Sequence, residues 1–296
     1  MNVVKTIACI PAFNEELRIA SVAILSREYG KVVVVDDGSA DSTAKVAKAT
    51  GAKVIRHEKN MGYGAAINTC LETGLKEKSD ALVIIDGDGQ HDPADIPKLL
   101  KALGEGFDVV VGSRFLSEND IPRYRKAGIS ALNTMTNLGS GAQVSDTQSG
   151  FRAYNKKALK ALVGIKNSGM GAGSEILVKA SDAGLKIAEV PIKVRYLDHA
   201  SKRNALLHGF TVTTALVDMI RLRKPFAFFG LIGLASLLIG GLFGLYTLDL
   251  YNVNRALPFG PTIITVFFLL TGMLSIFSAL ILDSLNRIVD SRKEEG

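Results

Sequence analysis

Two long runs without a charged residue stand near the C-terminus, and they constrain the fold more than any other feature. Residues 225–248 and 261–282 comprise 24 and 22 residues, and none of these residues is charged. At about 1.5 Å per helical residue, each run is long enough to cross a hydrocarbon layer of about 30 Å. We therefore expect two membrane-spanning helices, joined by the loop 249–260 into a hairpin whose ends lie on one side of the bilayer.

The charges that flank the two runs predict the orientation of this hairpin. The loop between the runs carries Arg255, which Asp249 balances. Basic residues gather instead at the outer ends, as Arg221, Arg223 and Lys224 before the first run and Arg287, Arg292 and Lys293 after the second. Because basic residues are enriched on the cytoplasmic side of spans, we expect a protein of the cell membrane with both termini in the cytoplasm.

The segment before the first run carries most of the net charge. Residues 186–224 contain eight basic and three acidic residues, in a chain whose formal net charge is +6. This position favours attraction to anionic lipid or to a lipid phosphate. The apolar residues Leu206, Phe210, Val217 and Ile220 fall on one helical face. We therefore expect an amphipathic helix that lies at the membrane interface or against another subunit.

The remainder of the chain alternates between strand-like and helix-like segments. Short apolar or β-branched runs occupy 5–10, 31–35, 52–56, 81–85 and 107–111, and helical patterns lie between them at 15–28, 41–50, 63–77 and 94–103. Strands that alternate with helices predict an α/β domain in which a mainly parallel, Rossmann-like sheet is covered by helices on both faces. The fold class is therefore α/β with a C-terminal hairpin of two transmembrane helices.

Polar clusters follow four of the five expected strands. They read PAFNEE at 11–16, DDGSADST at 36–43, DGDGQHDP at 86–93 and GSRF at 112–115. Ligands of parallel α/β sheets bind outside the carboxyl ends of the strands. The four clusters are therefore expected to form a single site.

Several function classes are excluded or disfavoured. The 47% hydrophobic content excludes a disordered chain. Two cysteines, Cys9 and Cys70, exclude a disulfide-stapled scaffold, and no Cys/His cluster suggests zinc. The first strand is not followed by GxGxxG, and no GxxxxGK[ST] loop is present, so dehydrogenase and P-loop chemistries are disfavoured.

Asp86-Gly87-Asp88 provides the strongest chemical signal. Two carboxylates at a strand end can face one hard cation, and oxygen ligands suit Mg²⁺ or Mn²⁺, which also bridge the oxygens of a diphosphate. Gln90 can add a neutral oxygen ligand. An isolated pair of this kind often only caps a turn. The second acidic pair, Asp36-Asp37, favours the metal interpretation.

Taken in order and spacing, these motifs resemble family 2 glycosyltransferases of the GT-A fold. DTQSGFRAY (146–154) and EVPIKVRYLDHASKRN (189–204) are similar to segments of the branch that glycosylates dolichyl and polyprenyl phosphates. The resemblance covers about residues 5–224. With the two runs, it implies a cytosolic catalytic domain (1–198), a juxtamembrane helix (199–224), two spans (225–248 and 261–282), an external loop (249–260) and a cytosolic tail (283–296).

The resemblance also implies roles for individual residues. The nucleoside pocket would be lined by Pro11, Phe13, Glu15, Val35 and Asp37, while Asp36 caps the turn. Asp86 and Asp88 would bind the nucleotide sugar and, with Gln90, the Mg²⁺ or Mn²⁺ ion; Asp88 is also the catalytic position that the family favours. The acceptor phosphate would be bound by Arg114, a second catalytic residue, by Arg123 or Arg125, and by Lys202 and Arg203.

The expected activity is therefore transfer of a hexose from a nucleotide-diphosphate sugar to dolichyl or polyprenyl phosphate, with inversion, at the cytosolic membrane face. A UDP-sugar such as UDP-glucose or UDP-N-acetylglucosamine is favoured, and GDP-mannose remains open. A lipid monophosphate has a second pKa of about 6, so an anionic oxygen is available at pH 7 without a general base. The product would supply lipid-linked sugar for glycosylation of proteins or of the cell surface.

Two other function classes fit the sequence less well. A processive polysaccharide synthase needs a QxxRW motif, which a chain without Trp cannot contain. A membrane-anchored adaptor that binds nucleotide sugar without catalysis would be favoured by loss of a metal carboxylate, yet Asp86 and Asp88 are present.

The GxxxG sequence Gly240–Gly244 and the resemblance predict a homo-oligomer, a tetramer. We expect no nucleic-acid partner.

Overall fold

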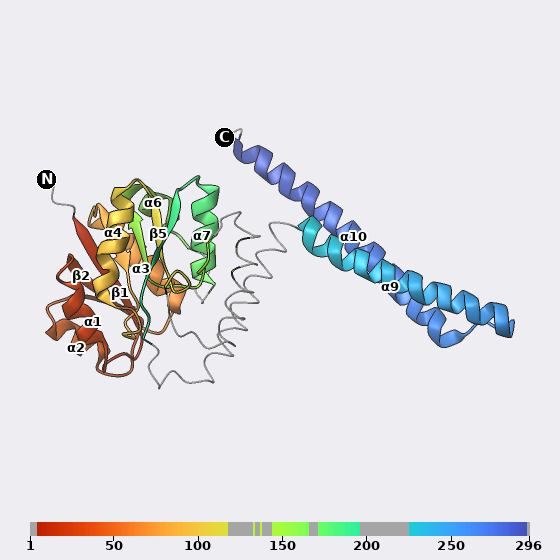
Figure 1. The fold of residues 1–296 in the computed structure, drawn as a ribbon, viewed down its shortest axis with the longest axis horizontal. Helices are drawn as coiled ribbons and strands as arrows, with labels where there is room; N and C mark the ends of the chain where they lie inside the picture. Colours follow the sequence, from red (N-terminus) through yellow and green to blue (C-terminus); the bar gives the residue numbers. More distant parts are fainter. Residues whose placement is uncertain are drawn as a thin grey trace. The chain divides into compact units, whose positions relative to one another are not determined.

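The computed structural model describes residues 5–117, 133, 137, 144–165, 171–195 and 225–294, with side chains described to Leu285. The chain divides into two compact units, Met1–Leu216 and Val217–Gly296, and each is described here by itself (Figure 1). The expected juxtamembrane helix 199–224 lies outside the described residues.

Within the described residues of the first unit, seven strands form one sheet (Figure 1). They are β1 (Thr6–Ala12), β2 (Lys31–Asp36), β3 (Lys53–Arg56), β4 (Ala81–Ile84), β5 (Val109–Ser113), β6 (Arg152–Asn155) and β7 (Ile187–Pro191). Their spatial order is β3-β2-β1-β4-β6-β5-β7. Neighbouring strands are parallel except at β6, which runs antiparallel to both β4 and β5. The sheet is therefore mixed, and it contains the five expected strands together with β6 and β7, which sequence analysis did not predict.

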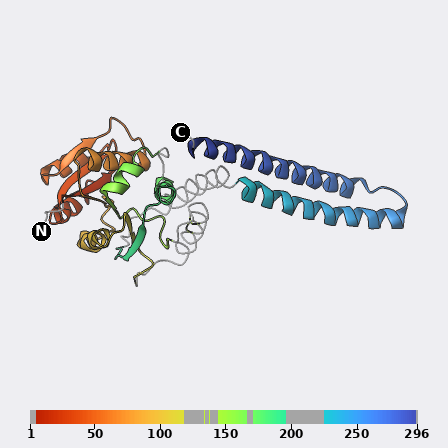
Figure 2. The same ribbon diagram turned by 90° about the horizontal axis from the view of Figure 1, so that it is seen from above.

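Helices cover both faces of this sheet, as expected for an α/β domain. They are α1 (Ile19–Ser26), α2 (Thr43–Ala49), α3 (Tyr63–Lys76), η1 (Pro93–Asp95), α4 (Ile96–Gly104), α6 (Lys156–Leu162) and α7 (Ala172–Asp182). Figure 2 shows α3 and α6 on one side of the sheet and α4 on the other. Each face has its own apolar core, which contains Ile19, Ile96 and Leu99 on one face and Ile67, Leu71 and Leu159 on the other. Full burial of such aliphatic side chains stabilises the fold by about 1.5–3 kcal/mol each.

The antiparallel direction of β6 determines which segments meet at one edge of the sheet. The carboxyl ends of β1, β2 and β4 share an edge because these strands are parallel. β6 pairs with β4 in the opposite direction, with Ile84 opposite Arg152, so β6 begins where β4 ends. The loop 146–151 is thereby brought to the edge at which the acidic residues after β4 lie.

The chain after β7 is attached to the loop that follows β4. His91 and Val194 form an isolated antiparallel bridge. The Arg195 backbone N–H donates to the Gln90 carbonyl at 2.9 Å, and the Lys193 N–H donates to Asp95 Oδ2 at 2.8 Å. Residues 192–195 therefore support the loop 88–95 along its length.

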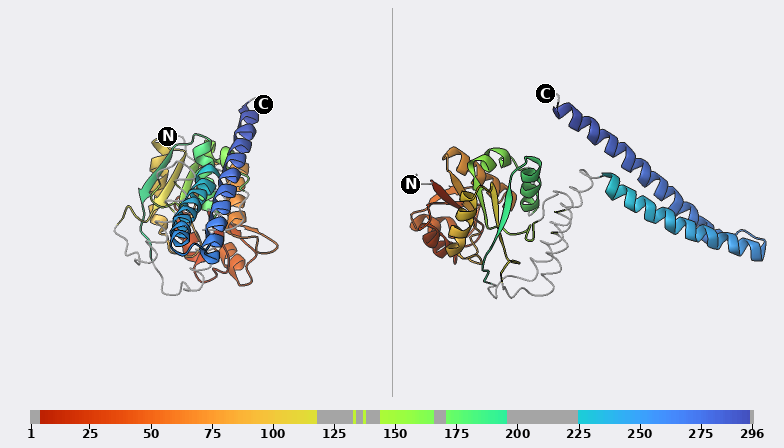
Figure 3. Two further views of the ribbon diagram at one scale, coloured as in Figure 1. Left: turned by 90° about the vertical axis from the view of Figure 1, so that its right-hand side faces the viewer. Right: turned by 45° about the horizontal axis from the view of Figure 1, so that its top comes forward.

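The described residues of the second unit form two long helices that pack side by side, α9 (Pro225–Asn254) and α10 (Phe259–Glu294) (Figure 3). Within Pro225–Asn254 and Phe259–Leu285, an 18-residue window has a mean hydropathy of 2.2 and 2.3, so both helices are long and apolar enough to span a membrane. α9 extends further than the expected span 225–248 and includes half of the expected loop. The chain turns between Asn254 and Phe259, and the expected transmembrane hairpin is confirmed as a pair of apolar helices.

Small residues let these two helices approach closely. A Cβ atom on Gly233 would lie 2.9 Å from the carbonyl oxygen of Gly272, and one on Gly240 would lie 2.9 Å from a Leu269 methyl group. A Cβ on Gly244 would lie 3.4 Å from the Thr265 methyl group. Gly240 and Gly244 therefore pack against α10 within the hairpin. The GxxxG sequence no longer indicates contact with another copy of the chain. The homo-oligomer itself stays a prediction.

Candidate active site

The carboxyl ends of β1, β2 and β4 are joined by backbone hydrogen bonds, which bring the first three polar clusters together. Pro11 pairs with Val35 in the β1–β2 register. The Asp37 N–H donates to the Ala12 carbonyl at 2.9 Å, and the Gly87 N–H donates to the Pro11 carbonyl at 3.2 Å. The expected nucleoside residues Pro11, Val35 and Asp37 therefore adjoin the start of the Asp-x-Asp cluster.

The two aspartates after β2 organise the backbone around them. Asp36 Oδ1 accepts from the Ser39 N–H at 3.1 Å, which is the turn-capping role expected for it. Asp37 Oδ1 accepts from the Met61 N–H at 3.0 Å, and Asp37 Oδ2 accepts from the Gly62 N–H at 2.9 Å. His57 Nδ1 lies 2.7 Å from Asp37 Oδ1. Asp37 thus shapes the loop 57–62, and its contact with a base or ribose stays a prediction.

Phe13 and Glu15 follow β1 and differ in their surroundings. The Phe13 side chain is 44% exposed, so an aromatic face is available for stacking at the expected nucleoside pocket. Burial raises the pKa of Glu15, and the negative charge of Asp88 raises it further. Arg18, which sequence analysis missed, lies 3.6 Å from Glu15 and counteracts this shift. Its charge also lowers the pKa of Asp88, so Arg18 is a cation at the edge of the site.

Asp86 and Asp88 form an electrostatically unfavourable pair. Burial raises the pKa of both carboxyls, and the charge of Asp86 raises the pKa of Asp88 as well. Asp88 Oδ1 accepts from the backbone N–H of Gln90 at 3.0 Å, so the loop folds back on this carboxylate. A divalent cation would relieve the repulsion between the two carboxylates, which is why the residues present fit Mg²⁺ or Mn²⁺.

The protein contributes few ligands to such an ion. Among the described residues, no group of three or more His, Cys, Asp or Glu side chains is arranged to hold a metal. Mg²⁺ is commonly bound through one or two carboxylates, with waters and substrate phosphates completing its shell. The donor set of Asp86, Asp88 and Gln90 agrees with an ion that is shared with a diphosphate.

His91 lies beside this pair without neutralising it. Its side chain is 7% exposed, its ring centroid lies 5.4 Å from that of Phe151, and its Nε2 lies 3.7 Å from Asp86 Oδ2. Burial lowers the pKa of His91 to about 4, so the imidazole is neutral at pH 7. His91 therefore does not neutralise the pair, whose negative charge is offset within the protein by the charges of Arg18, Arg114 and Arg152 and can be offset further by a bound cation.

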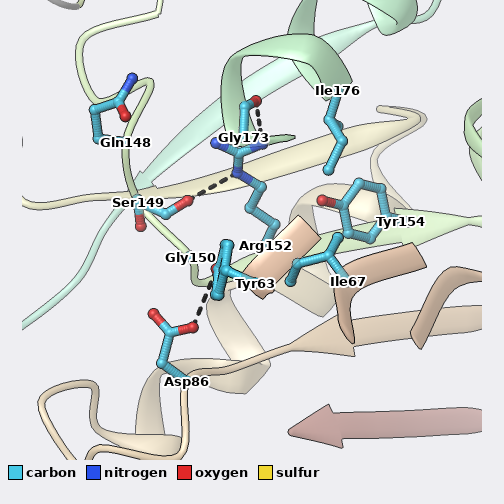
Figure 4. A pocket seen from close by; sticks show the side chains of 10 residues that line it. All are labelled: Tyr63, Ile67, Asp86, Gln148, Ser149, Gly150, Arg152, Tyr154, Gly173 and Ile176. Carbon is cyan, nitrogen blue, oxygen red and sulfur yellow. Dashed lines mark hydrogen bonds between the residues drawn. The ribbon is translucent and has the colours of Figure 1, made fainter. Parts of the chain in front are cut away.

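A cavity of about 150 Å³ adjoins Asp86 (Figure 4). It lies between α3, β6, the loop 148–150 and the first turn of α7, and its lining residues are Tyr63, Ile67, Asp86, Gln148, Ser149, Gly150, Arg152, Tyr154, Gly173 and Ile176. A Cβ atom on Gly150 would lie 2.2 Å from Asp86 Oδ2, so only glycine allows the loop to approach the carboxylate this closely.

Arg152 holds the wall of this cavity together. Its side chain is buried, and its guanidinium donates to the carbonyls of Ser149 at 2.8 Å, Gly173 at 2.8 Å and Thr147 at 2.7 Å. The loop 147–150 and the start of α7 are thereby joined by one buried cation. The segment 146–154 was expected by resemblance, but Tyr63, Gly150 and Arg152 were not singled out. Tyr63 and Gly150 contact Asp86, and Arg152 reaches Gly173, and all of these partners are more than 20 positions away in the sequence.

Arg114 follows β5 and is engaged by a buried carboxylate. Its Nε donates to Asp146 Oδ2 and its Nη2 to Asp146 Oδ1, both at 2.7 Å, and Asp146 is completely buried. The backbone N–H groups of Ser145 and Asp146 donate in turn to the carboxylate of Glu189 on β7, at 2.8 and 3.0 Å. The acceptor role of Arg114 stays a prediction. The other expected phosphate ligands, Arg123, Arg125, Lys202 and Arg203, lie outside the described residues.

Comparisons with known proteins agree on one family. The family described as glycosyl transferase family 2 matches residues 7–163. The chain is 34% identical over 240 residues to the UDP-N-acetylglucosamine–dolichyl-phosphate N-acetylglucosaminyltransferase of Methanococcus voltae, covering 73% of this chain and 95% of that protein. It is 33% identical to the dolichyl-phosphate hexose transferase of Haloferax volcanii, covering 70% and 90%.

A solved structure supports the fold. Glucosyl-3-phosphoglycerate synthase from Mycobacterium tuberculosis, crystallised with Mn²⁺, UDP and phosphoglyceric acid, superposes with a TM-score of 0.59 at 24% identity. The superposition covers 73% of this chain and 78% of that one. At this level of identity the likeness concerns the fold of the sheet and its helices.

Proposed function

The chain belongs to glycosyl transferase family 2, in the branch of the dolichol-phosphate hexosyltransferases, and we propose that it transfers a hexose from a UDP-sugar to dolichyl or polyprenyl phosphate with the help of a divalent metal ion. It is a glycosyltransferase, so the alternative of a non-catalytic adaptor is wrong. The absence of Trp leaves no QxxRW motif for a processive synthase.

One observation carries the proposal for the donor side. Asp86 and Asp88 lie at the carboxyl end of β4, next to the ends of β1 and β2, and their pKa values are raised by burial and, for Asp88, by mutual repulsion. A nucleotide diphosphate bound with Mg²⁺ or Mn²⁺ would bring the positive charge that this pair needs. Phe13 stands after β1, where its exposed ring would stack on the base.

The sugar of the donor would then lie beside Asp86, where the cavity provides both polar and apolar surface. Gln148 and Ser149 offer hydrogen-bonding groups, and Ile67 and Ile176 offer apolar contact. We favour a UDP-sugar, because a relative that matches 73% of this chain is named for UDP-N-acetylglucosamine. UDP-glucose is the second candidate and GDP-mannose the third.

The reaction is a direct displacement. An anionic oxygen of the lipid phosphate attacks the anomeric carbon, the new carbon–oxygen bond forms as the bond to the diphosphate breaks, and the configuration inverts. No side chain has to remove a proton, because the second pKa of the acceptor phosphate is about 6. His91 would be a weak base at pH 7, because burial lowers its pKa to about 4.

The residues of this chain contribute positioning and charge. Asp86, Asp88 and Gln90 would hold Mg²⁺ or Mn²⁺, which when bound neutralises the charge of the departing diphosphate. On the acceptor side, Arg114 lies at the end of β5. We place the acceptor phosphate there, with Arg123 or Arg125 and the membrane-proximal Lys202 and Arg203 completing a cationic cradle.

The two apolar helices support the assignment of this chain as a membrane protein. We propose that both helices span the bilayer, that the catalytic domain and both termini face the cytoplasm, and that the chain assembles into a homo-oligomer. The concentration of basic residues at the outer ends of the spans supports this orientation. Cysteine labelling of the turn at 255–258 from outside intact cells tests it, and labelling that requires permeabilised cells would contradict it.

A donor panel tests the proposed reaction. The detergent-purified chain is incubated with a polyprenyl phosphate and, separately, with UDP-glucose, UDP-N-acetylglucosamine and GDP-mannose, each with and without Mg²⁺ or Mn²⁺. We expect a glycolipid from one UDP-sugar in the presence of metal. Transfer from GDP-mannose alone would identify GDP-mannose as the donor instead. Transfer that persists in excess EDTA would contradict the proposed requirement for a metal ion.

A further inference from the structure

Asp86 is held from two sides by segments that are distant from it in the sequence. The Tyr63 hydroxyl, at the first position of α3, donates to Asp86 Oδ1 at 3.1 Å. On the other side, the backbone of Gly150 packs against the same carboxylate so closely that no side chain fits. Figure 4 shows Tyr63 and Gly150 next to Asp86 at the rim of the cavity. The rotation of this carboxylate is therefore set by its neighbours.

The position of Tyr63 depends in turn on Asp37. Asp37 Oδ2 accepts from the N–H of Gly62, the residue before Tyr63, at 2.9 Å. His57 joins Asp37 to α3, since its Nδ1 lies 2.7 Å from Asp37 and its Nε2 lies 3.0 Å from the Thr69 hydroxyl. A continuous set of contacts thus runs from the carboxylate after β2 to the carboxylate after β4.

A phenol suits this place because it is a neutral donor. A lysine or arginine bonded to Asp86 would neutralise the carboxylate and compete with a metal ion for it. A tyrosine hydroxyl satisfies one oxygen and leaves the negative charge in place.

We infer that Tyr63 is a positioning residue for the metal–diphosphate site: its hydrogen bond fixes the rotation of the Asp86 carboxylate in the orientation that receives the cation. The inference rests on the proposed function, because it assumes that Asp86 is a ligand. Residues that orient a metal ligand from outside its coordination shell commonly change metal affinity by about 10–100-fold when they are lost.

A packing role would be the simpler explanation, and the chain provides a control for it. Tyr154 on β6 lines the same cavity and is 1% exposed, and its hydroxyl interacts with Arg152 instead of Asp86. Tyr63→Phe and Tyr154→Phe each remove one hydroxyl from this cavity. Only the first removes a hydrogen bond to the proposed ligand.

The test measures Mn²⁺ binding to the full chain in detergent by electron paramagnetic resonance, in the presence of UDP and, separately, of GDP. In the better nucleotide we expect Tyr63→Phe to raise the Kd for Mn²⁺ by about 10–100-fold. Tyr154→Phe should stay within about twofold of wild type, because its hydroxyl does not contact the ligand. At saturating Mn²⁺, Tyr63→Phe should regain most of its nucleotide affinity.

Two outcomes would overturn the inference, and a third would overturn the proposed metal-dependent function. An unchanged Mn²⁺ affinity in Tyr63→Phe overturns the inference, and so does an equal loss in Tyr154→Phe, which would indicate packing. If the wild-type chain binds no Mn²⁺ with either nucleotide, the proposed metal-dependent function is wrong and the inference falls with it.

Discussion

The donor and acceptor sides of the candidate site handle charge in opposite ways. On the donor side, Asp86 and Asp88 lie close together, and burial raises the pKa of both. On the acceptor side, Arg114 and Asp146 neutralise each other through two hydrogen bonds of 2.7 Å. The first side holds two carboxylates that a bound cation would help to neutralise, whereas the second already contains a buried ion pair.

The two sides therefore differ in their effect on the stability of the fold. Carboxylates that repel each other destabilise the metal-free protein, so their presence is explained by ligand binding. A buried ion pair is already satisfied, and its loss exposes the remaining partner to an apolar environment. The electrostatics of the proposed donor side therefore support the proposal that it binds a cation. The acceptor side needs an experiment that separates phosphate binding from structural support.

The largest effect should come from Asp88→Asn. The amide removes one anionic ligand, so transfer should fall by more than about 100-fold, beyond the loss typical of outer-shell residues. The same change removes the repulsion with Asp86, so the metal-free variant should melt at or above the wild-type temperature. Transfer assays and circular dichroism measure the two effects. Near-wild-type turnover at limiting Mg²⁺ or Mn²⁺ would contradict the assignment of Asp88 as a ligand of the metal ion.

Arg114→Ala should lower both the stability and the turnover of the protein. Loss of the arginine leaves Asp146 buried and unpaired, which should cost about 3–5 kcal/mol in the free energy of unfolding. Acceptor-dependent turnover should fall by about 10–150-fold if the arginine also bonds the phosphate, with nucleotide affinity within about twofold. Chemical denaturation and calorimetry measure the two quantities.

A double variant separates the two roles of Arg114. In Arg114→Gln with Asp146→Asn, a neutral pair replaces the ion pair, and we expect most of the stability to return while turnover stays low. Recovery of turnover together with stability would mean that Arg114 only supports the loop 144–147. Collapse of donor binding with normal acceptor dependence would instead assign Arg114 to the diphosphate.

Phe13→Ala should have a smaller effect, confined to the donor side. Aromatic stacking contributes about 0.5–1.5 kcal/mol beyond burial, so nucleotide affinity should fall by about 2- to 12-fold. Because the side chain is 44% exposed, stability should change little. Phe13→Tyr keeps the ring and serves as the control in calorimetric titrations. An equal loss of nucleotide affinity in both variants would contradict the placement of Phe13 in the nucleoside pocket.

The smallest effect on activity is expected for Glu77→Gln, at a charge cluster away from the site. Glu77 lies 2.9 Å from both Lys31 and Lys53, and these hydrogen bonds lower its pKa from 4.5 to about 2. Because the folded pKa is depressed, the carboxylate stabilises the protein above about pH 4.5, and this contribution is lost as the pH falls toward about 2. The wild type and Glu77→Gln should therefore differ in melting temperature at pH 7 and converge in acid, with equal transfer activity. A difference as large at pH 2 as at pH 7 would contradict the assignment.

Local patterns explain why much of the fold could be predicted. The strands β1 to β5 are short apolar or β-branched runs, and α3 repeats apolar residues at the spacing of Ile67, Cys70 and Leu71. The long runs without charge identify α9 and α10 by composition alone. Asp86 and Asp88 follow the carboxyl end of a strand, and ligands of α/β sheets bind outside the carboxyl ends of parallel strands.

The sequence by itself determined these elements because periodicity and composition act over a few residues. Only the tertiary structure decided that β6, four residues long, inserts antiparallel between β4 and β5 and brings the loop 146–151 to Asp86. It also decided that Arg114 pairs with Asp146, 32 positions away, and that Tyr63 reaches Asp86, 23 positions away. Such partners are chosen by strand pairing and burial across the whole sheet, where a buried polar group must find a hydrogen bond, and no local pattern specifies which one it finds.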